Sequence, residues 1–114
     1  MLFIETPVFS RSLEGLLDDE GYRVLQTELS ANPAAGDLIP GGGGIRKYRF
    51  ALTGRGKRGG ARLIYYWQVA ADRIFMLLAY AKNRQDDLTP DELAVLRQLV
   101  KRLDHETRKK SDFR

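Results

Sequence analysis

The feature that most constrains the fold is a pair of strand-like segments, residues 45–52 and 61–68, separated by a glycine-rich connection. In the first segment apolar and basic side chains alternate with a period of two residues, the pattern of a strand with one buried face. Its apolar positions are Tyr48, Phe50 and Leu52, and its basic positions are Lys47 and Arg49. The connection, residues 53–60, holds four glycines and three basic residues, which is typical of a tight turn region. These segments predict a β-hairpin with a basic face.

Two further strands complete the predicted sheet. Residues 74–80 carry apolar or aromatic side chains at every position, as in a central strand that is buried on both faces. A turn near residues 70–72 would make this strand antiparallel to the one before it. Residues 2–5 are rich in β-forming side chains and predict a short first strand. We therefore expect an antiparallel meander of three strands to which the amino-terminal strand is added.

Two helices are predicted between the first strand and the hairpin. The first starts near Ser10, and Gly15 weakens it by about 1 kcal/mol relative to alanine. Its apolar face consists of Leu13, Leu16 and Leu17. Asp18 or Asp19 can cap the second helix. Both helices would lie in the acidic amino-terminal third of the chain.

The second helix should end at Asn32, because a residue that precedes a proline avoids the α region. Residues 33–44 contain two prolines and five glycines and predict a loop. Four of these glycines are consecutive, but no Lys-Ser/Thr pair and no helix follow them, so a nucleotide-binding phosphate loop is excluded. The predicted loop therefore leads directly into the hairpin.

The last helix has the clearest start signal. Thr89 offers an N-cap, Pro90 fits the first helical position, and Glu92 completes a capping box. Leucines and a valine then recur every three or four residues up to Leu103, and the charged tail from about Arg108 is expected to fray. The predicted order is β-α-α-β-β-β-α, an α+β fold with a mainly antiparallel sheet, two amino-terminal helices and one carboxy-terminal helix.

The length and composition indicate a single domain over residues 1–114. A chain of 114 residues, 43% of them hydrophobic, has enough apolar material for one core. It has no cysteine, which excludes disulfides, thiolate metal ligands and a cysteine nucleophile. No apolar run approaches the roughly 18 residues that a membrane span needs, and the amino terminus lacks the basic start of a secretion signal. We expect a soluble, cytoplasmic protein that binds no membrane.

The positive charge is concentrated in the middle of the chain. Residues 1–40 hold two basic and seven acidic side chains, whereas residues 41–84 hold ten basic and one acidic. Residues 85–114 hold seven of each sign. Such a segment is typical of a protein that binds a polyanion, although an ordinary solvated surface is the alternative.

The predicted hairpin gathers the candidate site residues on one face of the sheet. Lys47, Arg49 and Arg62 can converge there. Like charges held together repel, and a phosphate backbone would relieve that repulsion. Around them we expect further RNA contacts from Arg46, Arg55, Lys57, Arg58, Tyr66 and Arg84, and a hydroxyl or cation from Tyr80 and Lys82. Interleaved aromatic rings suit unstacked bases of single-stranded RNA.

Other chemically capable residues are assigned structural roles. His105 is the only histidine and follows the apolar positions of the last helix, so we expect it on the surface or in packing. Trp67 and Tyr65 fall on the apolar face of their strand. The acidic pairs Asp18-Asp19 and Asp86-Asp87 lie at helix or loop boundaries and are interpreted as caps or solvated charge. No metal site or other cofactor is supported.

The basic segment closely resembles the HigB-like branch of the RelE/ParE toxins, the toxins of type II toxin–antitoxin systems. The resemblance rests on GIRKYR at residues 44–49, GKRGGARLIYYW at residues 56–67 and YAKN at residues 80–83. The predicted order of elements is also that of the family, so the resemblance covers nearly the whole chain.

This resemblance implies a ribosome-dependent endoribonuclease that needs no metal. Such toxins enter the ribosomal A site and cleave messenger RNA by attack of a ribose 2′-OH on the adjacent phosphate. The family's basic positions fall here on Lys47, Arg49 and Arg62. Arg62, whose side chain we expect to face solvent and substrate, would hold the phosphate and stabilise the charge of the transition state. Lys47 could act as base, and Arg49 would clamp the phosphate.

The sequence departs from the family pattern at the end of the last strand. A RelE arginine falls on Lys82-Asn83-Arg84, and the tyrosine that should follow has no counterpart. Tyr80, Lys82 or Arg84 are the alternatives for the general acid. The partners implied are the ribosome with its RNA, messenger RNA and a helix-turn-helix antitoxin. Two other functions stay open: a ParE-like gyrase inhibitor without catalysis, and a basic RNA-binding module.

Overall fold

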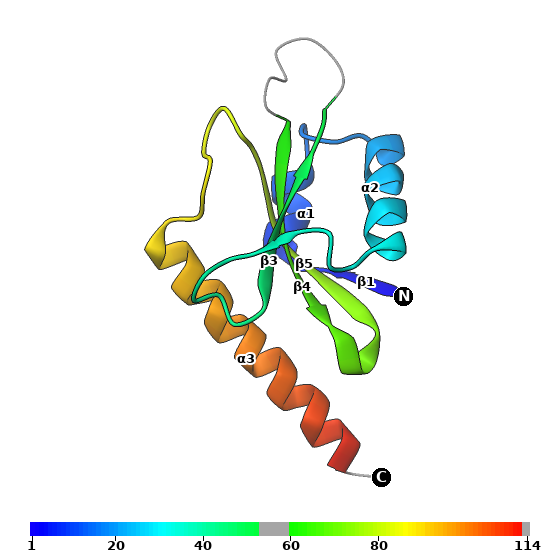
Figure 1. The fold of residues 1–114 in the computed structure, drawn as a ribbon, viewed down its shortest axis with the longest axis vertical. Coiled ribbons are helices and arrows are strands. Elements are labelled where there is room, and N and C mark those ends of the chain that lie inside the picture. Colours follow the sequence, from blue (N-terminus) through cyan, green and yellow to red (C-terminus); the bar gives the residue numbers. More distant parts are fainter. Residues whose placement is uncertain (53–59, 113–114) are drawn as a thin grey trace.

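The structure is a computed structural model, and it describes residues 1–52 and 60–112. Within these residues it contains one five-stranded sheet and three α-helices (Figure 1). The strands are β1 (Leu2–Glu5), β2 (Asp37–Leu38), β3 (Ile45–Phe50), β4 (Ala61–Gln68) and β5 (Arg73–Ala81). The helices are α1 (Pro7–Leu13), α2 (Asp19–Ala31) and α3 (Pro90–Asp112), with a short 3₁₀ turn at Val69–Ala71. The α+β class and the mainly antiparallel sheet are confirmed.

The strands lie in the order β1-β5-β4-β3-β2. The meander β3-β4-β5 is antiparallel, as expected, and β1 joins it by pairing parallel to β5. Strand β5 is therefore internal, which explains why its side chains are apolar on both faces. One strand was not predicted: β2, inside the expected loop 33–44, pairs antiparallel with β3 at the other edge. The first strand of the hairpin also ends at Phe50, two residues earlier than expected.

Helices cover both faces of the sheet (Figure 1). On one face, Leu63, Tyr65 and Met76 are fully buried among side chains of α1 and α2, such as Phe9 and Leu25. On the other face, α3 packs on a second cluster that includes Ile45, Ile64, Phe75, Leu77 and Val100. None of the helices in the described part of the chain is long and apolar enough to cross a membrane.

The first helix starts and ends earlier than the sequence predicted. Thr6 is its N-cap, accepting a hydrogen bond from the Phe9 amide at 3.1 Å, and Pro7 occupies the first helical turn. The helix ends at Leu13, because Gly15 adopts a left-handed φ of +74° that glycine tolerates best. The prediction of a helix from Ser10 onward was therefore wrong. It treated a terminating glycine as an interior one.

The other two helices begin where their caps predicted. Asp18 accepts a hydrogen bond from the Gly21 amide at 2.7 Å, and Asn32 is the C-cap of the same helix. At the start of α3, Thr89 and Glu92 exchange the two hydrogen bonds of a capping box, at 2.9 and 3.1 Å. The helix continues to Asp112, beyond the point at which we expected fraying.

Candidate nucleic-acid interface and cleavage site

The three basic residues singled out by the sequence lie together on the α3 face of the sheet. Arg49 pairs in register with Arg62 on β4, and Arg62 pairs with Tyr80 on β5. Residues directly opposite each other on neighbouring strands share a face, so these three side chains form a row across the sheet. Lys47 lies two residues before Arg49 and therefore points to the same side. We call Lys47, Arg49 and Arg62 the cationic cluster.

The cluster is less open than the sequence suggested. Arg62 is only 6% exposed, so the expectation that it faces solvent was wrong. It lies on a central strand, beneath the segment that connects β5 to α3. One of its guanidinium nitrogens donates to the Ala61 carbonyl at 3.3 Å, and another lies 3.7 Å from a carboxylate oxygen of Asp86. The side chain of Lys47 is 14% exposed, whereas that of Arg49 is 65% exposed.

Each cation of the cluster has a carboxylate partner. The Lys47 ammonium donates a hydrogen bond to Asp87, Arg62 pairs with Asp86, and Arg49 lies 3.7 Å from Asp37. Asp86 and Asp87 are largely exposed, in agreement with the interpretation as solvated charge, but that interpretation missed their ion pairs. Both side chains are directed at the cluster because the connection crosses over it.

The side chain of Gln85 ties the connection to the start of α3. Gln85 donates from its side chain to the Asp87 carbonyl at 2.9 Å and to the capping Glu92 at 2.8 Å. We call Gln85, Asp86 and Asp87 the acidic strap. Proximity to Lys47 lowers the pKa of Asp87 below its ordinary value, so its charge is retained at neutral pH. The strap thus places anionic groups where a phosphate would have to bind.

Tyr80 completes the row and touches the strap. Its hydroxyl donates to the Asp86 carbonyl at 3.2 Å. Burial, and secondly the negative charge of Asp87, raise the pKa of Tyr80 to about 12. The phenol therefore keeps its proton at neutral pH and can serve as a hydrogen-bond donor beside Arg62.

Two of the expected RNA-contacting residues have structural contacts instead. Arg46 points to the opposite face of the sheet, where it donates to the carbonyls of Ala34 and Gly36 at 3.2 and 2.7 Å. Tyr66 lies beneath α3, and its hydroxyl donates to both carboxylate oxygens of Asp104 at 2.8 Å. Arg46 thereby holds the loop before β2, and Tyr66 holds α3 on the sheet. The structure does not bring either residue to the cluster.

The remaining expected residues lie near the end of β5 or outside the described part of the chain. Lys82 and Arg84 are exposed in the turn that follows β5, close in sequence to the strap. Arg55, Lys57 and Arg58 belong to residues 53–59, which the structure does not describe. His105 is exposed on α3, in agreement with the surface role expected for it. Within residues 1–52 and 60–112, no group of three or more His, Asp and Glu side chains is arranged to hold a metal ion.

The family of the chain follows from a sequence comparison. Residues 10–112 match the family model described as the RelE toxin of the RelE/RelB toxin–antitoxin system. The chain belongs to the RelE toxin family. The cationic cluster, the strap and all three helices fall within or overlap the matched residues.

A comparison of structures supports the fold of this RelE family member. It is similar to a chain in the crystal structure of the intact E. coli RelBE toxin–antitoxin complex, with a TM-score of 0.51 and 17% sequence identity. The match covers 68% of this chain and 92% of that chain. At this identity the likeness concerns the fold alone. The narrower HigB-like assignment stays a prediction.

The residues that sequence reasoning missed in this RelE toxin are Asp86 and Asp87. The partner of Asp87 is Lys47, forty residues away in the chain, and the partner of Asp86 is Arg62 on another strand, so no local pattern reports these contacts. One signal was present: two adjacent carboxylates follow closely after the basic turn at residues 82–84. Because β5 runs antiparallel to β4, the turn that follows β5 lies at the same end of the sheet as Arg62.

Proposed function

We propose that this toxin is a ribosome-dependent endoribonuclease that cuts messenger RNA in the ribosomal A site and thereby inhibits translation. The observation that carries the proposal is the row formed by Arg49, Arg62 and Tyr80, with Lys47 beside it. Three cations and a protonated phenol on one rigid sheet face match the needs of a phosphodiester that gains charge during cleavage.

The reaction requires no group beyond the protein and the RNA. The 2′ oxygen of a ribose forms a bond to the adjacent phosphorus while the bond from phosphorus to the 5′ oxygen breaks. A base takes the proton of the 2′-OH, and an acid gives a proton to the departing 5′ oxygen. The products are a 2′,3′-cyclic phosphate and a free 5′-OH. The pentavalent transition state carries extra negative charge on its phosphoryl oxygens.

The positions of the cationic cluster and Tyr80 on the sheet suggest which catalytic role each side chain takes. Arg62 is central and held on a rigid strand, so it is assigned to the phosphoryl oxygens. Arg49 is exposed and is assigned to the neighbouring phosphate. Lys47 is assigned as base, a role it can take only when Asp87 has moved away from its ammonium. Tyr80 is the preferred acid because it keeps its proton at neutral pH, and Lys82 and Arg84 are the alternatives.

The strap must move for RNA to reach Arg62. Arg62 is 6% exposed with Asp86 beside it, so a phosphate and Asp86 compete for the same guanidinium. The carboxylates of the strap are 63% and 73% exposed, so water can solvate them as soon as a phosphate takes their place on the cations. A phosphate backbone can therefore displace the strap at small cost.

The proposed partners follow from this activity. The ribosome and its RNA would position the messenger. Of the further contacts that the sequence predicted, those of Arg55, Lys57, Arg58 and Arg84 are kept in the proposal, whereas Arg46 and Tyr66 are left out because they hold structural contacts away from the cluster. A cognate antitoxin of the helix-turn-helix class would silence the toxin. The similar E. coli RelBE structure is a complex of a toxin with its antitoxin, which supports a partner of this kind.

A translating extract tests the proposal. The purified protein is added, and messenger 5′ ends are mapped together with the activity of DNA gyrase. Cuts within codons that depend on active ribosomes are expected. Intact messenger with arrested gyrase would favour the ParE-like alternative and overturn the proposal. RNA binding without any cut would identify the protein as a binding module.

A further inference from the structure

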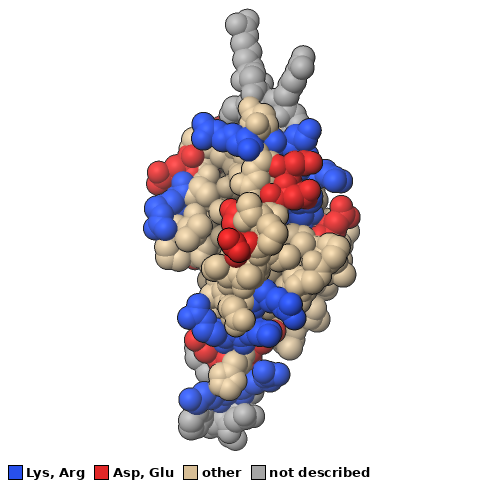
Figure 2. All heavy atoms as spheres, turned by 90° about the vertical axis from the view of Figure 1, so that its left-hand side faces the viewer, with Lys and Arg blue, Asp and Glu red and all other residues tan. Residues whose placement is uncertain are grey.

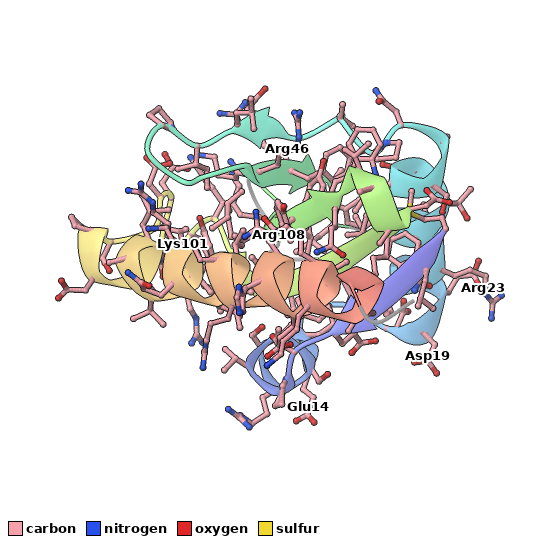
Figure 3. All side chains as sticks on the ribbon, turned by 90° about the horizontal axis from the view of Figure 1, so that it is seen from below. Glu14, Asp19, Arg23, Arg46, Lys101 and Arg108 are labelled. Atoms are coloured by element: carbon pink, nitrogen blue, oxygen red, sulfur yellow. The ribbon has the colours of Figure 1, made fainter. Side chains whose placement is uncertain are left out.

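Helix α3 carries a second group of cations, separate from the cationic cluster. Arg97, Lys101 and Arg108 are exposed, and their spacings of four and seven residues place them along one flank of the helix. We call these three residues the α3 row. Figure 2 shows Lys and Arg in an upper and a lower group on this side of the molecule, with Asp and Glu mainly among the upper group. Lys101 and Arg108 are labelled along α3 in Figure 3.

The α3 row differs from the cluster in its pairing. Each cation of the cluster contacts a carboxylate, whereas no carboxylate among residues 1–52 and 60–109, whose side chains the structure describes, lies within ion-pairing distance of the row. Asp104 lies on the same flank, but its oxygens accept hydrogen bonds from Tyr66 and Gln68 of β4. Its carboxylate is thereby directed at the sheet. The charge of the row is left facing solvent.

The loop beside the row leaves room for a large ligand. The side chain of Arg97 lies over Gly43, where an added Cβ would meet its Cγ at 3.8 Å. Gly41 has open space around the position of its missing Cβ. A chain of phosphates could therefore approach the flank without meeting bulky side chains from this loop. The sequence excludes the four glycines at residues 41–44 as a nucleotide-binding loop. Beside the α3 row, their lack of side chains leaves the flank of the helix accessible to a ligand.

We infer that the α3 row is a second docking surface for RNA, which binds a phosphate backbone of the ribosome while the cluster acts on the messenger. The inference rests on the proposed function. From Arg97 to Arg108 the row extends about 16 Å along the helix axis. In a nucleic-acid duplex the phosphates of one strand follow each other at about 3.4 Å along the axis. The row thus spans about four to five phosphates, enough for all three cations to be neutralised together.

Affinity for ribosomes tests the inference. The full-length variant Arg97→Gln, Lys101→Gln, Arg108→Gln is compared with the matched control Arg11→Gln, Arg102→Gln, Lys109→Gln. Both remove three exposed cations, and in the control two of these lie on the other flank of α3 and one on α1. Glutamine and arginine have similar helix propensities, so both variants should fold. The probe is vacant 70S ribosomes, with binding measured over a series of salt concentrations.

The row variant should bind about tenfold more weakly or worse, and its plot of log affinity against log salt should be shallower by about 2 to 3. Each single substitution should lower the slope by about 1. The control should stay within about twofold of the wild type. Equal losses in both variants, or none in the row variant, would overturn the inference. A wild-type protein that binds ribosomes through the row but cuts no messenger would overturn only the proposed function.

Discussion

Replacing Arg62 by alanine should affect the cleavage rate much more than the free energy of unfolding. The structure allows both losses to be estimated. The substitution removes the ion pair with Asp86, whose carboxylate is 63% exposed, and such a pair contributes about 0–1 kcal/mol. It also removes two buried methylene groups, at about 0.8 kcal/mol each. The free energy of unfolding should therefore fall by about 1.6–2.6 kcal/mol. From an initial stability of at least about 5 kcal/mol, more than about 95% of the variant stays folded.

The loss of activity should be far larger than this loss of folded protein. A preorganised donor to a charged transition state typically contributes a factor of about 100 to 1,000 to the rate. We expect Arg62→Ala to slow single-turnover cleavage on programmed ribosomes at least about 100-fold, and Arg62→Lys, which keeps the charge but not the paired donors, to be intermediate.

Urea unfolding of the same preparations gives the folded fraction, and Arg11→Ala and His105→Ala serve as controls. Both control residues are exposed and distant from the cluster in sequence, so cleavage should stay at the wild-type rate. A folded Arg62→Ala protein that cleaves at the wild-type rate would refute the assignment of Arg62. A folded His105→Ala protein without cleavage would show that the histidine takes part in the reaction.

Three further predictions follow from the structure. The double variant Asp86→Asn, Asp87→Asn should bind a single-stranded RNA analogue that lacks the attacking 2′-OH more tightly than the wild type does, because the carboxylates that pair with Lys47 and Arg62 are removed. Fluorescence anisotropy measures this affinity, and an unchanged value would argue against competition between the strap and RNA. Gly60→Ala should lower the free energy of unfolding by about 1–3 kcal/mol or more, because Gly60 has a φ of +69° and an added Cβ would lie 2.3 Å from the Phe50 carbonyl oxygen. An unchanged midpoint of urea unfolding would contradict this prediction. Burial and Asp104 raise the pKa of Tyr66 from 10.0 to about 12, so the folded state holds this proton more tightly and the free energy of unfolding should fall as the pH rises from about 10 to 12. In alkaline thermal melts Tyr66→Phe should show a smaller fall than the wild type, and an identical pH profile would contradict the assignment.

The elements with local signals could be predicted from the sequence. The capping box at Thr89 and Glu92, the cap at Asp18 and the alternation in β3 each depend on residues within a few positions, and all three predictions are confirmed. The prediction for the start of α1 was wrong for a local reason too. It relied on the apolar positions 13, 16 and 17, whereas the cap at Thr6 and Pro7 lies outside that pattern.

The candidate site was predictable only as far as strand alternation reaches. Period two placed Lys47 and Arg49 on one face, and the register of the hairpin added Arg62. The burial of Arg62 was not predictable in the same way, since it depends on where a connection with no periodic pattern crosses the sheet. The strap is held by Gln85 and by side-chain contacts of long sequence separation, which no repeat in the sequence encodes.

The parallel pairing of β1 with β5 has a consequence for how the toxin is made. Strand β1 is synthesised first, but its partner follows about seventy residues later, and the Thr6 hydroxyl donates to the Leu77 carbonyl across that separation. At about 5–20 residues per second, the first strand waits roughly 4–14 s for its partner. Tyr80 arrives with the same late strand. A nascent chain therefore cannot assemble the proposed cleavage site until more than two thirds of it has been translated, which delays any attack on the ribosome that is making it.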